Sequence, residues 1–409
     1  MDGAQSDRHG AAPTALVAGS AGIAGRAAVD ALAADGWKVV ALDVRPVPDE
    51  RVDVHTVAAD LLEGNLVRER LAPFSISHLF YTVQYQSWRP LDRRPPNVRS
   101  LRRQVRLAAR ALPLLELVPP AARALYAKAA LESGAADPEG RNRAMLENLL
   151  TALEGKSHAL RHVCVVTGGK HYGMHLGPRL FKEHETPYRE DESPRCPGPN
   201  WYYENEDMLR RWAGQWTWTI FRPSFIVGYG LGSPYNFGCS LAAYAALCRA
   251  LEMPLAFFGD ERNANCRWCV TSAKQLARMM IWASRAPAAA NQAFNCTGLE
   301  PFQWRDLWPE IAAWFELEPA WPKKGVSMTR FFAEHRPLWE KLVARHGLRT
   351  DPLHELASGD FIDRSMAIDW DAVYDMSKAH SAGFDHYPSA AETFTALFQE
   401  LRDTGVIPK

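Results

Sequence analysis

Hydrophobic residues in the first 85 positions gather in short runs, and each run is followed by a segment with helical spacing. The run Ala15–Ala18 ends in a glycine-containing turn that opens into an alanine-rich segment, and a second run over Lys38–Asp43 follows. Further runs begin at Val54 and at His78. This alternation predicts a Rossmann-type α/β fold: a doubly wound parallel sheet with right-handed crossovers and ligands at the carboxyl ends of the strands.

The alternation resumes after residue 138 and changes character near residue 231. We expect helices over 141–153, from Asn200, over 241–251 and over 273–284, strands over 160–166, 216–221 and 292–296, and an edge segment over 255–258. The last hundred residues are predicted to be mostly helical. The chain therefore divides into a dinucleotide-binding Rossmann domain over 12–230 and a smaller, mostly helical, mainly substrate-binding region over 231–409, interleaved with the first.

Residues 88–138 interrupt this pattern with a basic amphipathic segment. Hydrophobic residues recur at helical spacing between Val98 and Leu112, and five arginines fall on the opposite side: Arg99, Arg102, Arg103, Arg106 and Arg110. A second helix is predicted over 121–131. Three interpretations are open, in this order of preference: a surface helix with a solvated basic face, an oligomer or lid element beside the site, and a contact with a membrane surface.

Composition excludes several classes of partner. The chain has 409 residues, with Lys+Arg and Asp+Glu equal at 47 each, so its overall charge does not favour nucleic acid. No apolar run approaches the roughly 18 residues that a membrane span requires. The polar N-terminus lacks the order of a signal peptide, so we expect a cytoplasmic location. A homodimer is compatible with the sequence.

Seven cysteines are scattered through the second half of the chain without a framework, and we expect free thiols. Cys266 and Cys269 have the spacing of a redox pair. No second pair or histidine cluster accompanies them, so we predict neither a redox function nor a metal site there.

The glycine turn has the spacing G-x-x-G-x-x-G, at Gly19, Gly22 and Gly25. Glycines allow a bound pyrophosphate to approach the backbone and the amide dipoles of a helix N-terminus. Because a strand precedes the turn and a helix follows it, we predict an NAD(P)H site, with Ala21, Ile23 and Ala24 among its contacts. Asp60 follows the third strand and has two interpretations, a contact with the adenine amino group or an N-cap.

Hydride transfer to a carbonyl compound requires a donor on the oxygen where negative charge develops. Tyrosine serves when a nearby ammonium group stabilises its phenolate, and dehydrogenases with this glycine spacing usually place both groups in Tyr-x-x-x-Lys. This chain departs from that rule, because Glu206 stands four residues after Tyr202 and Asp207 four after Tyr203. The lysine placed near a strand's carboxyl end is Lys170.

Two linked motifs carry a family resemblance. The segment Thr167-Gly-Gly-Lys170-His-Tyr, followed by Asn200-Trp-Tyr202-Tyr203-x-x-Glu206-Asp207, resembles the progesterone 5β-reductase / iridoid synthase-like (PRISE) family, an atypical branch of the extended short-chain dehydrogenases. Its pattern is T-G-x-K-H-Y followed by N-F-Y-Y-x-x-E-D. The likeness continues through 222–228, 293–304 and 337–343 and so covers almost the whole chain.

The resemblance implies NAD(P)H-dependent reduction of an activated C=C bond in enones or enals. Tyr202 would hold the enolate oxygen and Lys170 would tune the site, with Tyr203 as the second candidate donor. The alternative is a purely structural role for both residues, with Tyr202 as an aromatic residue of the core and Lys170 as a surface charge. Contacts with the cofactor are also expected where successive strands end, at Leu61, Tyr81, Thr82, Val83, Thr167, Gly168, Pro223, Ser224 and Ile226.

Two departures from the family pattern affect the prediction. Where the family reads Ala-Arg-Arg-Pro, this chain has Asp43, Val44, Arg45 and Pro46. A carboxylate at Asp43 favours NADH over NADPH because it would accept bonds from a free ribose and repel a 2′-phosphate, while Arg45 keeps NADPH open. The segment 88–138 reads as an insertion at the ligand-binding edge. Two other functions stay open: a carbonyl reductase or alcohol dehydrogenase at the same site, and a non-catalytic dinucleotide sensor whose basic insertion binds a partner.

Overall fold

The computed structural model describes residues 12–85, 138–155, 159–196, 198, 200–212, 214, 216–322, 325–349 and 352–409. The basic amphipathic segment and the two helices expected over 98–112 and 121–131 lie outside these residues. Its three interpretations, surface helix, oligomer or lid element and membrane contact, therefore stay predictions.

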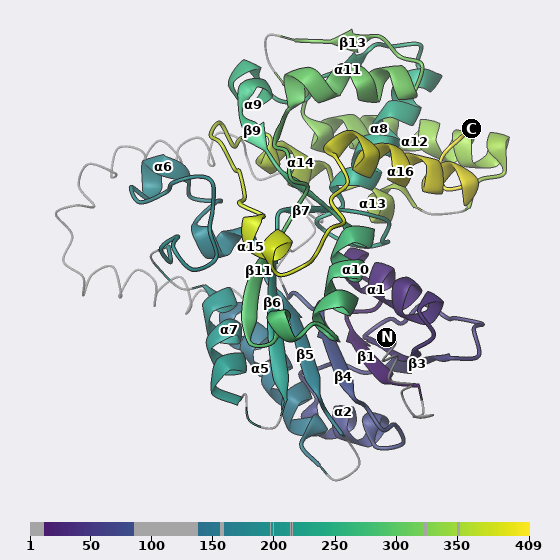
Figure 1. The fold of residues 1–409 in the computed structure, drawn as a ribbon. Coiled ribbons are helices and arrows are strands. Elements are labelled where there is room, and N and C mark those ends of the chain that lie inside the picture. The colour runs from purple at the N-terminus through teal and green to yellow at the C-terminus, as the bar shows by residue number, and fades with distance from the viewer. Residues whose placement is uncertain are drawn as a thin grey trace, which may run out of the picture.

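A seven-stranded, fully parallel sheet forms the lower half of the molecule in Figure 1, in the order β11-β6-β5-β4-β1-β2-β3. Its strands are β1 (Thr14–Ala18), β2 (Lys38–Asp43), β3 (Val54–Ala58), β4 (His78–Tyr81), β5 (His162–Val166), β6 (Thr217–Pro223) and β11 (Gln292–Cys296). The order runs outward from β1 in both directions, which confirms the predicted doubly wound fold.

Helices cover both faces of the sheet. One face packs against α1 (Ile23–Ala34), α10 (Ala273–Ala283) and α15 (Ser377–Ser381), and the other against α2 (Gly64–Leu71), α5 (Pro138–Leu153) and α7 (Trp201–Trp212). Along β1, Ala15 and Val17 enter the first core, and Leu16 and Ala18 enter the second. Since both faces of the strands are buried, their sequences read as continuous apolar runs rather than as an alternation.

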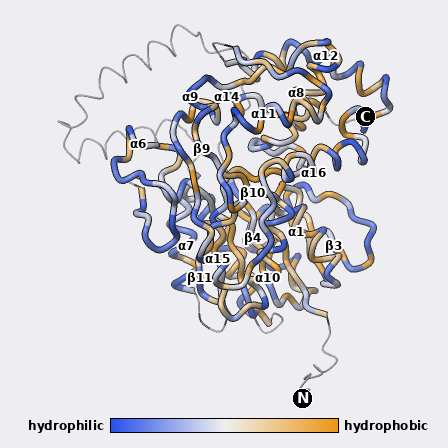
Figure 2. The backbone as a smooth tube through the Cα atoms, turned by 45° about the horizontal axis from the view of Figure 1, so that its top comes forward, coloured by the Kyte–Doolittle hydropathy of each residue, from blue (hydrophilic) through white to orange (hydrophobic). Residues whose placement is uncertain are grey.

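The C-terminal half forms a third core around α8 (Phe237–Ala250), in which the twelve residues from Phe237 to Cys248 are all buried. Its other long helices are α11 (Trp304–Trp314), α12 (Met328–His346) and α16 (Ala390–Asp403), above the sheet in Figure 1. Figure 2 shows hydrophobic stretches along the inner helices and strands and hydrophilic ones along peripheral loops. Because α10 and β11 return to the sheet, part of the C-terminal half packs into the sheet.

Short elements complete the fold. They are η1 (Gly169–Tyr172), α6 (Gly177–Leu180), β7 (Phe225–Val227), β8 (Leu255–Ala256), α9 (Glu261–Asn265), β9 (Arg267–Trp268), β10 (Val270–Ser272), η2 (Pro287–Ala289), β12 (Phe302–Gln303), β13 (Pro319–Ala320), α13 (Leu353–Leu356) and α14 (Gly359–Ser365). The predicted elements of the described part are present, with α8 beginning four residues before its expected start.

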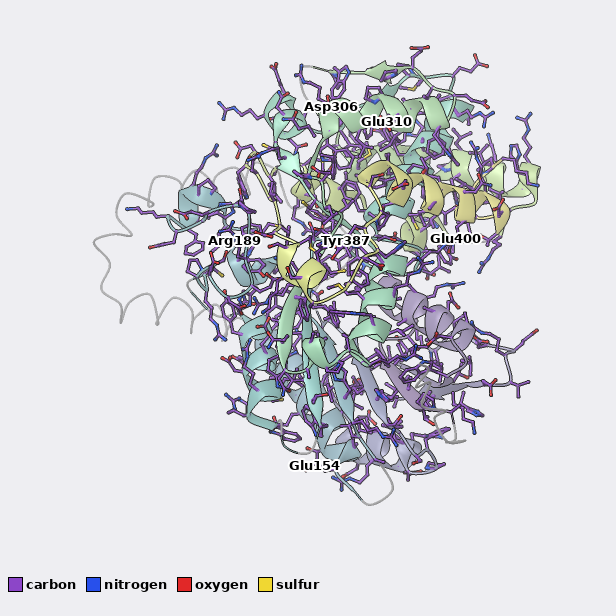
Figure 3. The ribbon with its side chains drawn as sticks, in the orientation of Figure 1. Glu154, Arg189, Asp306, Glu310, Tyr387 and Glu400 are labelled. Atoms are coloured by element: carbon purple, nitrogen blue, oxygen red, sulfur yellow. The ribbon has the colours of Figure 1, made fainter. Side chains whose placement is uncertain are left out.

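Long-range contacts tie the segment between α6 and α7 to the C-terminal half. Arg189, which Figure 3 labels beside the middle of the molecule, donates from Nε to Asp375 Oδ2 at 2.9 Å. The cysteines are free thiols, as expected. Burial raises the pKa of both Cys266 and Cys269 to about 11, so neither is a reactive thiolate at neutral pH. No helix among the described residues has the length and apolarity needed to cross a bilayer.

Candidate active site

The glycine turn between β1 and α1 forms a cradle that side chains would fill. Gly19 has a φ of +84°, and a Cβ there would lie 3.2 Å from the backbone carbon of Thr82. A Cβ on Gly25 would lie 2.0 Å from the Gly19 carbonyl oxygen. The turn is fixed to the next strand, because the Gly19 and Ser20 amides both donate to the Leu42 carbonyl, at 2.9 and 3.2 Å. Two of the three glycine functions of a dinucleotide fingerprint, the tight turn and the close helix packing, are therefore present.

The N-terminus of α1 is open to an anion. Gly22 is its N-cap residue, and no side chain caps the helix. The first amides, at Ile23 and Ala24, follow directly. The loop after β7 approaches from the other side, since a Cβ on Gly230 would lie 3.0 Å from the Ile23 nitrogen. Uncapped amides at the positive end of a helix fit a pyrophosphate.

Asp43 ends β2 beside this turn. Its Oδ2 accepts from the Ala21 amide at 3.1 Å, and its Oδ1 accepts from the Arg45 amide at 3.2 Å. Val44 and Arg45 are exposed, and a Cβ on Gly232 would lie 3.6 Å from Arg45 Nη2. The carboxylate therefore lies beside the glycine turn at the carboxyl end of β2, with one arginine close to it in sequence, and its contact with a ribose stays a prediction.

The N-cap interpretation of Asp60 is wrong. The helix α2 has Glu63 as its N-cap residue, and Asp60 Oδ1 instead accepts from the Leu62 amide at 2.9 Å in a local turn. Asp60 is exposed and Leu61 is buried beside it. An aspartate that bonds the amide two residues on is typical of a turn rather than of a helix start. The adenine contact stays a prediction.

At the ends of β4 and β6, the side chains are buried or bonded within the protein, so the backbone is what these strand ends present at the edge of the sheet. Tyr81 is fully buried in the core beneath α5 and α7, and Val83 packs on that core. Thr82 donates from Oγ1 to the Ala18 carbonyl at 2.9 Å, which joins β4 to β1. On β6 and beyond, Ser224 donates from Oγ to the Cys269 carbonyl at 2.7 Å.

Pro223 lies close to Gly168 across the two strand ends, because a Cβ on Gly168 would lie 3.3 Å from the Pro223 carbonyl oxygen. Ile226 belongs to β7, which pairs in parallel with β10. Both residues lie at or just beyond the carboxyl end of β6, Pro223 as its last residue and Ile226 three positions on, at the edge where this fold binds ligands.

Lys170 lies in η1, a single turn that follows β5, and is partly buried. The turn is fastened to the start of α7, since Asn200 donates from Nδ2 to the Lys170 carbonyl at 2.9 Å and accepts at Oδ1 from the Tyr202 amide at 3.1 Å. Asn200 therefore starts α7, as predicted, and also joins the two segments. Burial first, and then the Lys170 charge, lowers the pKa of His175 to about 4.

The two adjacent tyrosines of α7 have different environments. Tyr203 accepts at its hydroxyl from the Cys196 amide at 2.7 Å and donates to the His171 carbonyl, so its phenol is engaged with the backbone. Tyr202 is 5% exposed, and a Cβ on Gly168 would lie 3.3 Å from its hydroxyl. Burial, together with the nearby Tyr235 and Glu206, raises the pKa of Tyr202 well above its usual range. Tyr202 is thus a protonated phenol at the carboxyl end of β5.

Sequence reasoning missed a buried ion pair beneath these residues. Glu206 and Arg222 are 0% and 2% exposed, and the guanidinium donates to both carboxylate oxygens, Nε to Oε1 at 3.1 Å and Nη2 to Oε2 at 2.7 Å. Thr167 donates to Glu206 Oε1 at 3.0 Å, so its hydroxyl faces inward rather than the cofactor edge. The signal was available, because an arginine directly after the apolar run of β6 has to be paired when buried.

The comparisons with known proteins agree with this geometry. A model of the PRISE-like Rossmann-fold domain matches residues 122–408. The (S)-8-oxocitronellyl enol synthase CYC2 of Camptotheca acuminata is 33% identical over 279 residues, covering 65% of this chain and 70% of its own length. The 3-oxo-Delta(4,5)-steroid 5-beta-reductase of Arabidopsis thaliana is 26% identical over 410 residues, covering 96% and 93%.

Among solved structures, UDP-glucose 4-epimerase of Thermotoga maritima superimposes with a TM-score of 0.58 at 14% identity, covering 96% of this chain and 99% of its own. The enzyme WbmH of Bordetella bronchiseptica, solved with NAD+, has a TM-score of 0.58 at 15% identity, covering 97% and 100%. At these identities the likeness concerns the fold alone, which is an NAD(P)-binding Rossmann fold.

Proposed function

This chain belongs to the PRISE-like Rossmann-fold family, and we propose that it is an NAD(P)H-dependent reductase of activated C=C bonds in enones or enals. One observation carries the proposal: the buried, protonated phenol of Tyr202 lies at the carboxyl end of β5, beside the turn that holds Lys170. The glycine cradle opens at the same edge of the sheet. A hydrogen-bond donor and a dinucleotide site on one edge are what this chemistry needs.

The residues divide the work as follows. When bound, the reduced nicotinamide cofactor supplies a hydride to the β-carbon of the substrate. The electron pair of the C=C bond then shifts to the carbonyl, and the Tyr202 hydroxyl donates a hydrogen bond to the enolate oxygen that results. Lys170 adds a positive charge near that oxygen. A proton from solvent completes the product at the α-carbon, which gives a saturated carbonyl compound.

Tyr202 is favoured over Tyr203 as the donor. The Tyr203 hydroxyl already donates to one backbone carbonyl and accepts from one backbone amide, so using it for substrate would leave buried polar groups without partners. The bonds to Tyr203 instead tie the residue after Lys170 and the later loop at Cys196 to the helix α7. Its function is therefore structural in this proposal.

NADH is the proposed preferred cofactor. The Asp43 carboxylate is suited to accept hydrogen bonds from a free ribose and would repel a 2′-phosphate. Arg45 follows it closely and is exposed, which keeps use of NADPH measurable rather than absent. A homodimer and a cytoplasmic location are further predictions from the sequence.

An assay of NADH and NADPH consumption across small enones, enals and a steroid enone tests the proposal, with products identified by mass spectrometry. Saturated carbonyl products support it. Allylic alcohols would instead assign 1,2-reduction to the site. Tight dinucleotide binding without turnover of any carbonyl compound would support the non-catalytic sensor.

A further inference from the structure

Glu206 occupies the position that the lysine takes in Tyr-x-x-x-Lys, one helical turn after Tyr202. It is completely buried, and its carboxylate accepts from the side chains of Thr167, His171, Arg210 and Arg222 at 3.0, 3.1, 3.3 and 2.7 Å. Ordinary surface glutamates of a helix make no such set of bonds. A buried carboxylate with four donors from three segments fixes those segments relative to one another.

The donors bracket Lys170. Thr167 is the first residue after β5 and stands three residues before Lys170, and His171 follows Lys170 directly. Asn200, at the other end of the same stretch of α7, holds the Lys170 carbonyl at 2.9 Å. The helix that carries Tyr202 therefore grips the lysine turn at two places, through Asn200 and through Glu206.

Arg222 keeps the Glu206 carboxylate ionised. Burial by itself would raise the pKa of Glu206, but the Arg222 guanidinium and the His171 hydrogen bond more than offset it and hold this pKa well below its usual range. Arg222 is itself held by the Glu190 carbonyl at 2.9 Å and the Tyr172 hydroxyl at 3.2 Å. The Arg222–Glu206 ion pair thus also ties the end of β6 to the Lys170 turn.

We propose that Glu206 is a positioning residue, which holds the turn of Lys170 in register with Tyr202 in a chain whose lysine stands on that turn instead of on the helix. The catalytic role of Glu206 rests on the proposed function, whereas its structural role of holding the Lys170 turn does not. Glu206 has no contact with substrate in this proposal. Glu206 acts on catalysis through Lys170. Its effect on kcat therefore depends on the presence of Lys170, whereas the effect of a merely structural ion pair does not.

Hydrogen–deuterium exchange on the unliganded protein tests the grip without any assay of activity. The amides of His171, Gly173 and Met174 donate within the turn, to the carbonyls of Gly168, Lys170 and Gly169, and report its order. Glu206→Gln is expected to speed exchange of these amides about tenfold or more. The matched control is Glu204→Gln, the same change at an exposed position of α7, which should leave them unchanged. Unchanged exchange in Glu206→Gln would overturn the proposal.

Glu206→Gln leaves the buried Arg222 without its counter-charge, so two milder variants guard against misfolding. Thr167→Val and His171→Phe keep the ion pair and each remove one bond between Glu206 and the turn. Each is expected to speed exchange in the turn by a few-fold while circular dichroism stays native. If both leave exchange unchanged, Glu206 does not hold the turn.

A double-mutant cycle tests the link to catalysis. Glu206→Gln should lower kcat about tenfold in the presence of Lys170 and have little effect in a Lys170→Met background, since non-additivity of this size marks residues that act together. KM for the cofactor should change little. Equal effects in both backgrounds would assign Glu206 a structural role only.

The two proposals fail separately. Full activity of both Lys170→Met and Tyr202→Phe would refute the assigned chemistry, and the exchange experiment would still decide the grip on the turn. Reduced activity of those variants with an additive Glu206→Gln effect would refute only the inference about Glu206.

Discussion

Replacing Tyr202 by Phe removes one hydroxyl from the proposed site and leaves the rest of the side chain. The ring packs edge-on against Trp201, with centroids 4.2 Å apart, and Phe keeps that contact. Among the described residues the Tyr202 hydroxyl has no hydrogen-bond partner, so its removal leaves no buried group without its bond. We therefore expect a stable variant whose defect is confined to the chemical step.

The magnitude follows from what the hydroxyl does. A single preorganised donor on a developing oxyanion in a buried site contributes about 2.7–4 kcal/mol, which is a factor of about 100 to 1,000 in kcat. Tyr202 is 5% exposed and its raised pKa keeps it protonated at neutral pH, so it meets both conditions. KM for the cofactor should change less than twofold because the glycine cradle is untouched.

Stopped-flow measurement of cofactor oxidation with saturating enone gives the chemical step directly. Tyr203→Phe is the matched control: it loses the bonds to the Cys196 amide and the His171 carbonyl, which should cost about 1–3 kcal/mol of unfolding free energy with a smaller effect on kcat. A Tyr202→Phe enzyme with the wild-type rate, or a Tyr203→Phe enzyme with the larger loss of kcat, would refute the assignment.

Three further changes have defined outcomes. Asp43→Asn keeps the side-chain shape and should raise the ratio of kcat/KM for NADPH over NADH by about tenfold, the effect of roughly 1.4 kcal/mol of relieved repulsion; a constant ratio would mean that Asp43 does not contact the ribose. Gly25→Ala forces a Cβ to within 2.0 Å of the Gly19 oxygen and should weaken dinucleotide binding at least about tenfold by calorimetry, whereas undiminished affinity would contradict the cradle. Burial lowers the pKa of His78 and His162 to about 4, so the unfolded state binds more protons than the folded state between pH 6.5 and 4. Acidification to pH 5 should therefore cost about 2 kcal/mol of unfolding free energy for each histidine. Urea unfolding at pH 7.5 and 5.0 measures this loss, and His162→Gln should reduce it.

Local patterns predicted the elements whose causes are local. The apolar runs of β1, β2 and β4 are buried on both faces, and the Gly19–Gly25 spacing meets backbone that leaves no room for a side chain. Asn200 caps α7, as predicted from its side chain and from its position before an acidic first turn. These features depend on residues a few positions apart, which a sequence displays directly.

Features decided by distant segments escaped the prediction. The sequence analysis placed Glu206 only by its spacing from Tyr202, and its burial depends on Arg222 of β6, sixteen residues later, which pairs with it. The N-cap interpretation of Asp60 failed for a local reason, because its carboxylate accepts from the Leu62 amide two residues on and α2 begins only at Gly64. Glu206 thus depends on a partner that only the folded chain brings near, whereas Asp60 has its partner within its own turn.

The charge placed one turn after Tyr202 bears on which reduction the site favours. A lysine there would stabilise a phenolate and so assist full proton transfer, which an alkoxide, a strong base, demands in 1,2-reduction. Here the group is the Glu206 carboxylate, which, after burial and Tyr235, contributes to raising the pKa of Tyr202. A phenol with a raised pKa is a poor acid, but it keeps its proton and so still donates a hydrogen bond. An enolate is a much weaker base than an alkoxide and needs only such a donor, so the replacement of lysine by glutamate at this position is itself an argument for 1,4-reduction.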